Sequence, residues 1–125
     1  MQLSQHYGLT SYVLENSSVK TFVTAIGGHI TAQFDVNGKM VDPFFYNPWW
    51  NENREPIYGT PDYILRGIFF CFPFGLNKPM NGEDRPCHGH VACYTWQYGG
   101  SETKDGAANL TLTMDIPQEH CNVVK

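Results

Sequence analysis

The chain has 125 residues, the length of one domain, and its 42% hydrophobic and 14% aromatic residues suffice for a globular core. With only 16% charged residues, the composition excludes an intrinsically disordered chain, which needs low hydrophobicity and high charge. The formal net charge is -4, and lysine and arginine form no cluster, which argues against nucleic acid or an anionic membrane as a partner. We therefore treat residues 1–125 as one globular domain.

The N-terminal segment indicates the compartment. Residues 1–6 have neither the basic nor the apolar region of a secretion signal, and the longest apolar run, residues 68–72, is too short to span a bilayer. We therefore expect a cytoplasmic protein. In that compartment the cysteines are expected to be reduced thiols rather than disulfides. The cysteines are Cys71, Cys87, Cys93 and Cys121.

The first third of the chain predicts consecutive strands. Two short β-branched or aromatic runs lie between residues 12 and 24. The next run alternates apolar with polar residues, which predicts a strand with its apolar members buried. These members are Ile30, Ala32 and Phe34. An Asn37-Gly38 pair then predicts a type I′ hairpin, because both central residues of that turn need positive φ.

The middle of the chain carries aromatic and histidine-rich segments. Residues 43–61 are rich in aromatics and proline, and we expect either a lid on the sheet edge or a wall of a ligand cleft. Residues 65–75 are interpreted as an apolar strand. If residues 85–96 are also a strand, alternate side chains share one face. That face would carry His88, His90, Ala92, Tyr94 and Trp96.

The last clear element is another alternating run. Leu110, Leu112, Met114 and Ile116 alternate with polar residues, which predicts a strand with one buried face. No run of helix length shows apolar spacing of three and four residues. The fold class is therefore all-β, an antiparallel sandwich.

Several of these motifs occur in an order that resembles the aldose 1-epimerase family of galactose-mutarotase-like proteins. They are an Arg-Gly pair at residues 66–67, Pro-Phe-Gly at 73–75, Pro-x-His-Gly at 86–89 and a tryptophan at 96. The Gly-rich turn at 27–28 and the Asn-Gly hairpin at 37–38 are similar to that family's early hairpin. The resemblance covers residues 19–96.

The resemblance implies a fold and an activity. The family fold is a β-supersandwich that binds a sugar on its concave face, and this chain would correspond to the N-terminal half. The implied reaction is sugar anomer interconversion without a cofactor. The family's second histidine and its glutamate base have no obvious counterpart in the chain, so this half could be an inactive fragment.

The resemblance also implies the site residues. His88 matches the family's first histidine and is expected to be catalytic, since an imidazole can give or take a proton near neutral pH. Arg66 matches an arginine that contacts sugar hydroxyls. The other expected substrate-binding residues are His90, Trp49, Trp50 and Tyr94.

Other interpretations of the same residues stay open. Arg66 could be a structural arginine that pairs with Asp62 or Glu55. The domain could be a non-catalytic sugar-recognition module, or a cupin-like metal-binding protein that uses His88 and His90 as ligands on one strand face. The expected partners are a small sugar, and a second copy or the missing C-terminal half, because a half-sandwich leaves strand edges unpaired.

Overall fold

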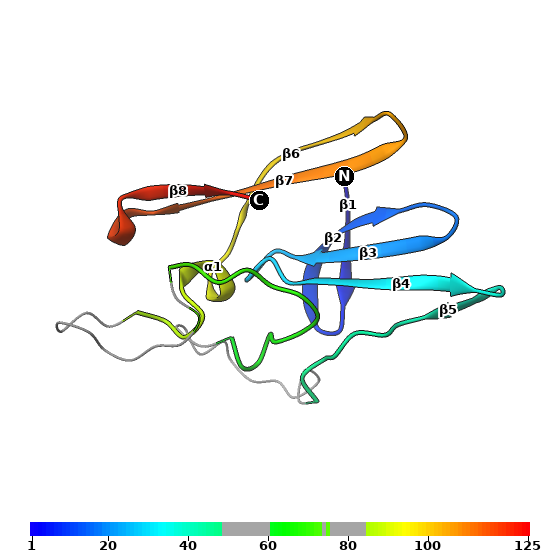
Figure 1. Cartoon of the computed structure of the whole chain (residues 1–125), viewed down its shortest axis with the longest axis horizontal. Helices are drawn as coiled ribbons and strands as arrows, with labels where there is room; N and C mark the ends of the chain where they lie inside the picture. The colour runs from blue at the N-terminus through cyan, green and yellow to red at the C-terminus, as the bar shows by residue number, and fades with distance from the viewer. Residues whose placement is uncertain (49–60, 74, 76–84) are drawn as a thin grey trace.

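The computed structural model describes residues 1–48, 61–73, 75 and 85–125. These residues form two antiparallel sheets, as the all-β prediction requires, with the strand order β1-β2-β3-β4-β5 in one and β6-β7-β8 in the other (Figure 1). The first sheet contains β1 (Gln2–His6), β2 (Leu9–Glu15), β3 (Val19–Thr24), β4 (Ile30–Val36) and β5 (Lys39–Val41). The rest comprises α1 (His90–Cys93), β6 (Gln97–Lys104), β7 (Ala107–Ile116), the 3₁₀ turn η1 (Pro117–Glu119) and β8 (Cys121–Val124).

Local turn chemistry builds the five-stranded meander. Asn37 and Gly38 have φ values of 55° and 79°, and Val36 pairs with Lys39 across them, so the predicted hairpin is confirmed. Between β2 and β3, the Asn16 side chain accepts hydrogen bonds from the backbone N–H groups of Ser18 and Val19, at 2.8 and 2.9 Å. Each strand therefore pairs with its neighbour in sequence.

The main core lies between β3, α1 and β7. Its buried members are Val23, Val91, Trp96, Leu112, Met114 and Ile116. The alternation predicted for residues 110–116 is confirmed at its last three apolar positions, which are at most 5% exposed. Figure 1 shows the β6–β8 sheet as a separate layer beside the first sheet, and β7 contacts β2. The two sheets thus share one core.

The burial predicted for β4 is only partly correct. Ala32 is buried, but Phe34 is 41% exposed, and the polar Thr31 is 1% exposed. Thr31 is buried where the segment around Gly67 pairs with the start of β4, through a bridge between Ile30 and Ile68, and its side chain lies close to Gly67. Residues on both faces of β4 are therefore buried at this point.

The strands predicted for residues 65–75 and 85–96 are wrong. Among its described residues, which leave out residue 74, the first segment forms only isolated bridges, at Arg66, Ile68 and Phe72. The second forms a turn at 87–88 followed by the single helical turn α1. Positive φ values at His88 (64°) and Gly89 (78°) bend the backbone out of the extended conformation. Alternate side chains therefore do not share one sheet face here.

Candidate functional site

A cavity lies where α1 meets the end of β7. Its volume is about 280 Å³, at the lower limit for small-molecule sites. The lining residues are His90, Tyr94, Thr95, Met114, Asp115, Ile116, Pro117 and Gln118. The cavity thus combines an aromatic wall, an apolar floor and several polar groups.

The helical turn α1 positions the aromatic wall. The N–H of Tyr94 donates to the carbonyl of His90 at 3.0 Å, which closes one turn and puts the two side chains on the same side. Their rings stack with centroids 5.5 Å apart and an interplanar angle of 18°. His90 and Tyr94, both expected at the site, are therefore neighbours through helical spacing, not through strand alternation.

An acid–base pair borders this cavity. Nε2 of His90 lies 3.5 Å from Oε1 of Glu119, which is long for a hydrogen bond. The His90 side chain is 7% exposed, and its Nε2 has no hydrogen-bond partner among the described residues. A buried nitrogen without a partner is costly, so a ligand or water that reached it would be bound favourably.

Arg85 fixes the carboxylate of this pair. Its Nε donates to Oε1 of Glu119 at 2.5 Å and its Nη2 to Oε2 at 3.2 Å, a bidentate contact. The hydrogen bond from Arg85 lowers the pKa of the Glu119 carboxyl below its ordinary value. Glu119 therefore stays ionised at neutral pH and can accept a proton or a hydroxyl hydrogen bond.

Arg66 lies away from this cavity, buried with an exposure of 1% next to the turn between β1 and β2. Its Nε donates to the carbonyl of Ile64 at 3.0 Å, and its Nη1 donates to the carbonyls of His6 and Tyr7 at 2.9 and 3.1 Å. Burial lowers the pKa of the guanidinium to about 10, so it stays charged at neutral pH. These bonds to backbone carbonyls give Arg66 a structural role.

The remaining predicted residues are distributed differently. His88 does not line the cavity, and its Nδ1 lies 3.5 Å from the sulfur of Cys71. Trp49 and Trp50 lie outside the described residues. The structure therefore brings together His90 and Tyr94, and it separates them from Arg66.

The strand-face metal site is not formed. His88 and His90 lie on a turn and a helical turn, so they do not share a sheet face as cupin-like ligands would. Within residues 1–48, 61–73, 75 and 85–125, no group of three or more His, Cys, Asp or Glu residues could hold a metal ion. The metal-binding interpretation therefore lacks the convergent ligands that it needs.

Sequence reasoning missed Glu119 and Arg85. They are 34 positions apart, and Glu119 follows the strand without any supporting pattern. The proline at the start of η1 is typical of the first turn of a helix and was the local signal that the chain turns back there. Only the tertiary fold shows that this turn returns to His90.

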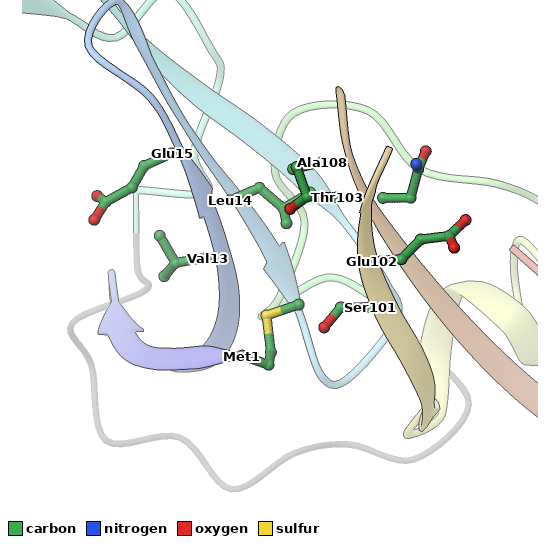
Figure 2. A pocket seen from close by; sticks show the side chains of 9 residues that line it. Met1, Val13, Leu14, Glu15, Ser101, Glu102, Thr103 and Ala108 are labelled. Atoms are coloured by element: carbon green, nitrogen blue, oxygen red, sulfur yellow. The ribbon is translucent and has the colours of Figure 1, made fainter. Parts of the chain in front are cut away.

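A second hollow lies between the two sheets, far from the predicted residues in sequence. Two overlapping cavities of about 320 and 340 Å³ share Leu14, Glu15, Thr103 and Ala108. Figure 2 shows Leu14 of β2 directed toward the β6–β7 hairpin, near Thr103 and Ala108. The residues that line this second hollow include no buried nitrogen without a hydrogen-bond partner, which is the feature that distinguishes the His90 cavity.

In the described part of the chain, no helix has the length and apolar character needed to cross a membrane. Comparisons of the sequence and the structure with protein-family models, curated proteins and solved structures find no match.

Proposed function

We propose that this chain binds a small carbohydrate in the His90 cavity and that it is related to the aldose 1-epimerases. The observation that carries the proposal is the buried His90, which lines a cavity of about 280 Å³ and lies next to the partly buried Glu119. The ordered motifs at residues 66–96 support the relationship to that family, but their Arg66 and His88 do not line the cavity. The proposed reaction is the interconversion of sugar anomers without a cofactor.

The chemistry of mutarotation needs two proton-transfer groups. One takes the proton of the anomeric hydroxyl while the other protonates the ring oxygen, and the ring then opens. The Glu119 carboxylate is ionised and oriented by Arg85, so it is the proton acceptor for the first step, and its lowered pKa makes it a weak base. The imidazole of His90 can supply the second, and the ring of Tyr94 offers a face for the apolar side of a pyranose.

The first test is anomerisation and sugar binding in His90→Gln and Glu119→Gln. Each variant should slow polarimetric anomerisation of free galactose or glucose by about 100-fold or more, because each loses a proton-transfer group. Calorimetric titration should show weaker sugar binding in His90→Gln. His120→Asn is the matched control, since His120 is exposed and its left-handed backbone suits asparagine.

His88→Asn distinguishes the residue implied by the family resemblance from His90, because asparagine also tolerates the φ of 64° at this position. A loss of rate only in His88→Asn would move the chemistry away from the His90 cavity. Sugar binding without turnover in any form would support a non-catalytic recognition module. Absence of binding to every reducing monosaccharide would refute the proposal.

We also propose a cytoplasmic location, which the free thiols of all four cysteines support.

Self-association through the β5 edge is a further part of the proposal. β5 is the last strand of its sheet, and Val41 (40% exposed) pairs with the exposed Phe34. Sedimentation should detect dimers or larger species, and Val41→Lys should return the chain to the monomer, because a charge on an edge strand opposes pairing. Val124→Lys, at an exposed valine of β8, should leave association unchanged. A monomeric wild-type chain would contradict the proposal.

A further inference from the structure

Cys71 and His88 form a thiol–imidazole pair that the His90 cavity does not use. Sγ of Cys71 lies 3.5 Å from Nδ1 of His88, and in the tautomer that carries its proton on Nε2 the ring nitrogen accepts from the thiol. The ring of Phe69 packs edge-on against His88, with centroids 5.2 Å apart, and limits its rotation. The imidazole is therefore positioned to take the proton of the thiol.

The backbone brings a second cysteine to this pair. A parallel bridge joins Phe72 to Gly89, so Cys71 runs beside the turn at residues 86–89. The N–H of Gly89 closes that turn by donating to the carbonyl of residue 86 at 2.8 Å. Cys87 lies within the turn, directly before His88. Cys71 and Cys87 are both partly exposed, so a small oxidant can reach them.

The third nearby cysteine is not available for the same chemistry. Cys93 is 3% exposed, and its thiol donates to the carbonyl of Cys87 at 3.2 Å. Burial raises the pKa of the Cys93 thiol to about 12. Burial also raises the pKa of the Cys71 thiol, with a further increase from Cys87. Cys71 is therefore protonated at neutral pH, and it needs a base to react as a thiolate.

We propose that Cys71 and Cys87 form a reversible disulfide, with His88 as the base that activates Cys71 toward a small disulfide such as oxidised glutathione. The sulfur of Cys71 attacks one glutathione sulfur as its proton moves to Nδ1 of His88, and glutathione thiolate leaves. The thiolate of Cys87 then attacks the Cys71 sulfur of the mixed disulfide and releases the second glutathione thiolate. Two electrons pass from the protein to glutathione disulfide.

The test is incubation of the whole chain with oxidised glutathione at neutral pH, followed by mass spectrometry of proteolytic fragments. The expected product links Cys71 to Cys87, with the loss of two hydrogen atoms. Cys87→Ser should accumulate the mixed glutathione disulfide on Cys71. His88→Asn should slow the first step by about ten-fold or more, because the amide cannot take the proton. Cys93→Ser is the matched control and should still form the disulfide.

A stable mixed disulfide in the wild-type chain, or a different cysteine pair, would overturn the proposal. Equal rates in His88→Asn and the wild type, with far-ultraviolet circular dichroism unchanged, would also overturn it. The wild-type product requires no substitution, so the outcome does not depend on the folding of a variant. Sugar binding is measured separately, and its failure leaves this result intact.

Discussion

Replacing Gly89 with alanine is expected to lower the free energy of unfolding by about 4 kcal/mol, the sum of left-handed backbone strain and overpacking. Gly89 has a φ of 78°, and an added Cβ would lie 1.8 Å from the carbonyl oxygen of Phe72. Because that oxygen belongs to the backbone, relief requires the bridge between the two segments to open. Urea denaturation followed by tryptophan fluorescence measures the change.

Gly106→Ala is the matched control for this substitution. Gly106 also has a φ of 78°, but no atom lies within 4 Å of the position of an added Cβ. It should therefore lose only the backbone contribution, about 1–2 kcal/mol. Equal losses in the two variants would mean that the close approach of Phe72 to the turn at 86–89 does not exist in solution.

The second large effect concerns His29, which is fully buried beside the turn at 27–28. Its Nε2 lies 3.1 Å from the carbonyl oxygen of Ala92, and its Nδ1 accepts the amide N–H of Arg66 at 3.3 Å. These partners suit a neutral ring with its proton on Nε2. A second proton, on Nδ1 of His29, would face the backbone N–H of Arg66 and would have no acceptor. Burial is the main cause that lowers the pKa of His29 to about 4; the hydrogen bond to Ala92 opposes this shift, and electrostatic interactions with Arg66 and Lys125 add to it.

The stability should therefore fall with acidification. In the unfolded chain His29 takes up a proton near pH 6.5, and in the folded chain only near pH 4, so the unfolded state binds more protons between these values. The contribution is complete above pH 6.5 and is lost as the pH falls. Between pH 7 and pH 5 the loss should be about 2 kcal/mol, and by pH 4 about 3 kcal/mol.

Urea denaturation at pH 7 and pH 5 measures this loss, in a range where most carboxylates are still ionised. His29→Gln keeps a donor for the Ala92 carbonyl but cannot be protonated, so it should lose most of the dependence on pH. His6 is also held neutral, since burial lowers its pKa, and it accounts for part of any dependence that remains. An unchanged pH dependence in His29→Gln would show that another group controls acid stability.

The parts of the fold that were predictable are those set by neighbouring residues. Asn37 and Gly38 specify a turn through their own backbone preferences, and the alternation from Leu112 to Ile116 needs only one buried sheet face. The predicted burial of Phe34 was wrong because β4 nears its end there and leaves the core. Thr31 is buried, against the prediction, because the segment around Gly67 packs against its side chain. The alternation of apolar and polar residues within a strand cannot indicate that the polar face of the strand is also covered.

The geometry of the candidate site depends even more on contacts between residues that are distant in sequence. His90 and Tyr94 were expected together on a strand, and they do lie together, but on a helical turn that two positive φ values precede. Of these two residues only Gly89 adopts positive φ without a steric cost, whereas every residue with a Cβ, histidine included, does so uncommonly. The contact of His90 with Glu119 depends on where β7 and η1 place a residue from the other end of the domain.

The buried guanidinium of Arg66 has a consequence for the order of folding. The five-stranded meander pairs neighbours in sequence, but Arg66 bonds carbonyls that are 60 and 59 positions away, at His6 and Tyr7. Contacts that close such long loops form after local hairpins, because the entropy of loop closure must be met first. The guanidinium therefore acts mainly on the unfolding rate, so it sets the lifetime of the native state and not the speed at which that state is reached.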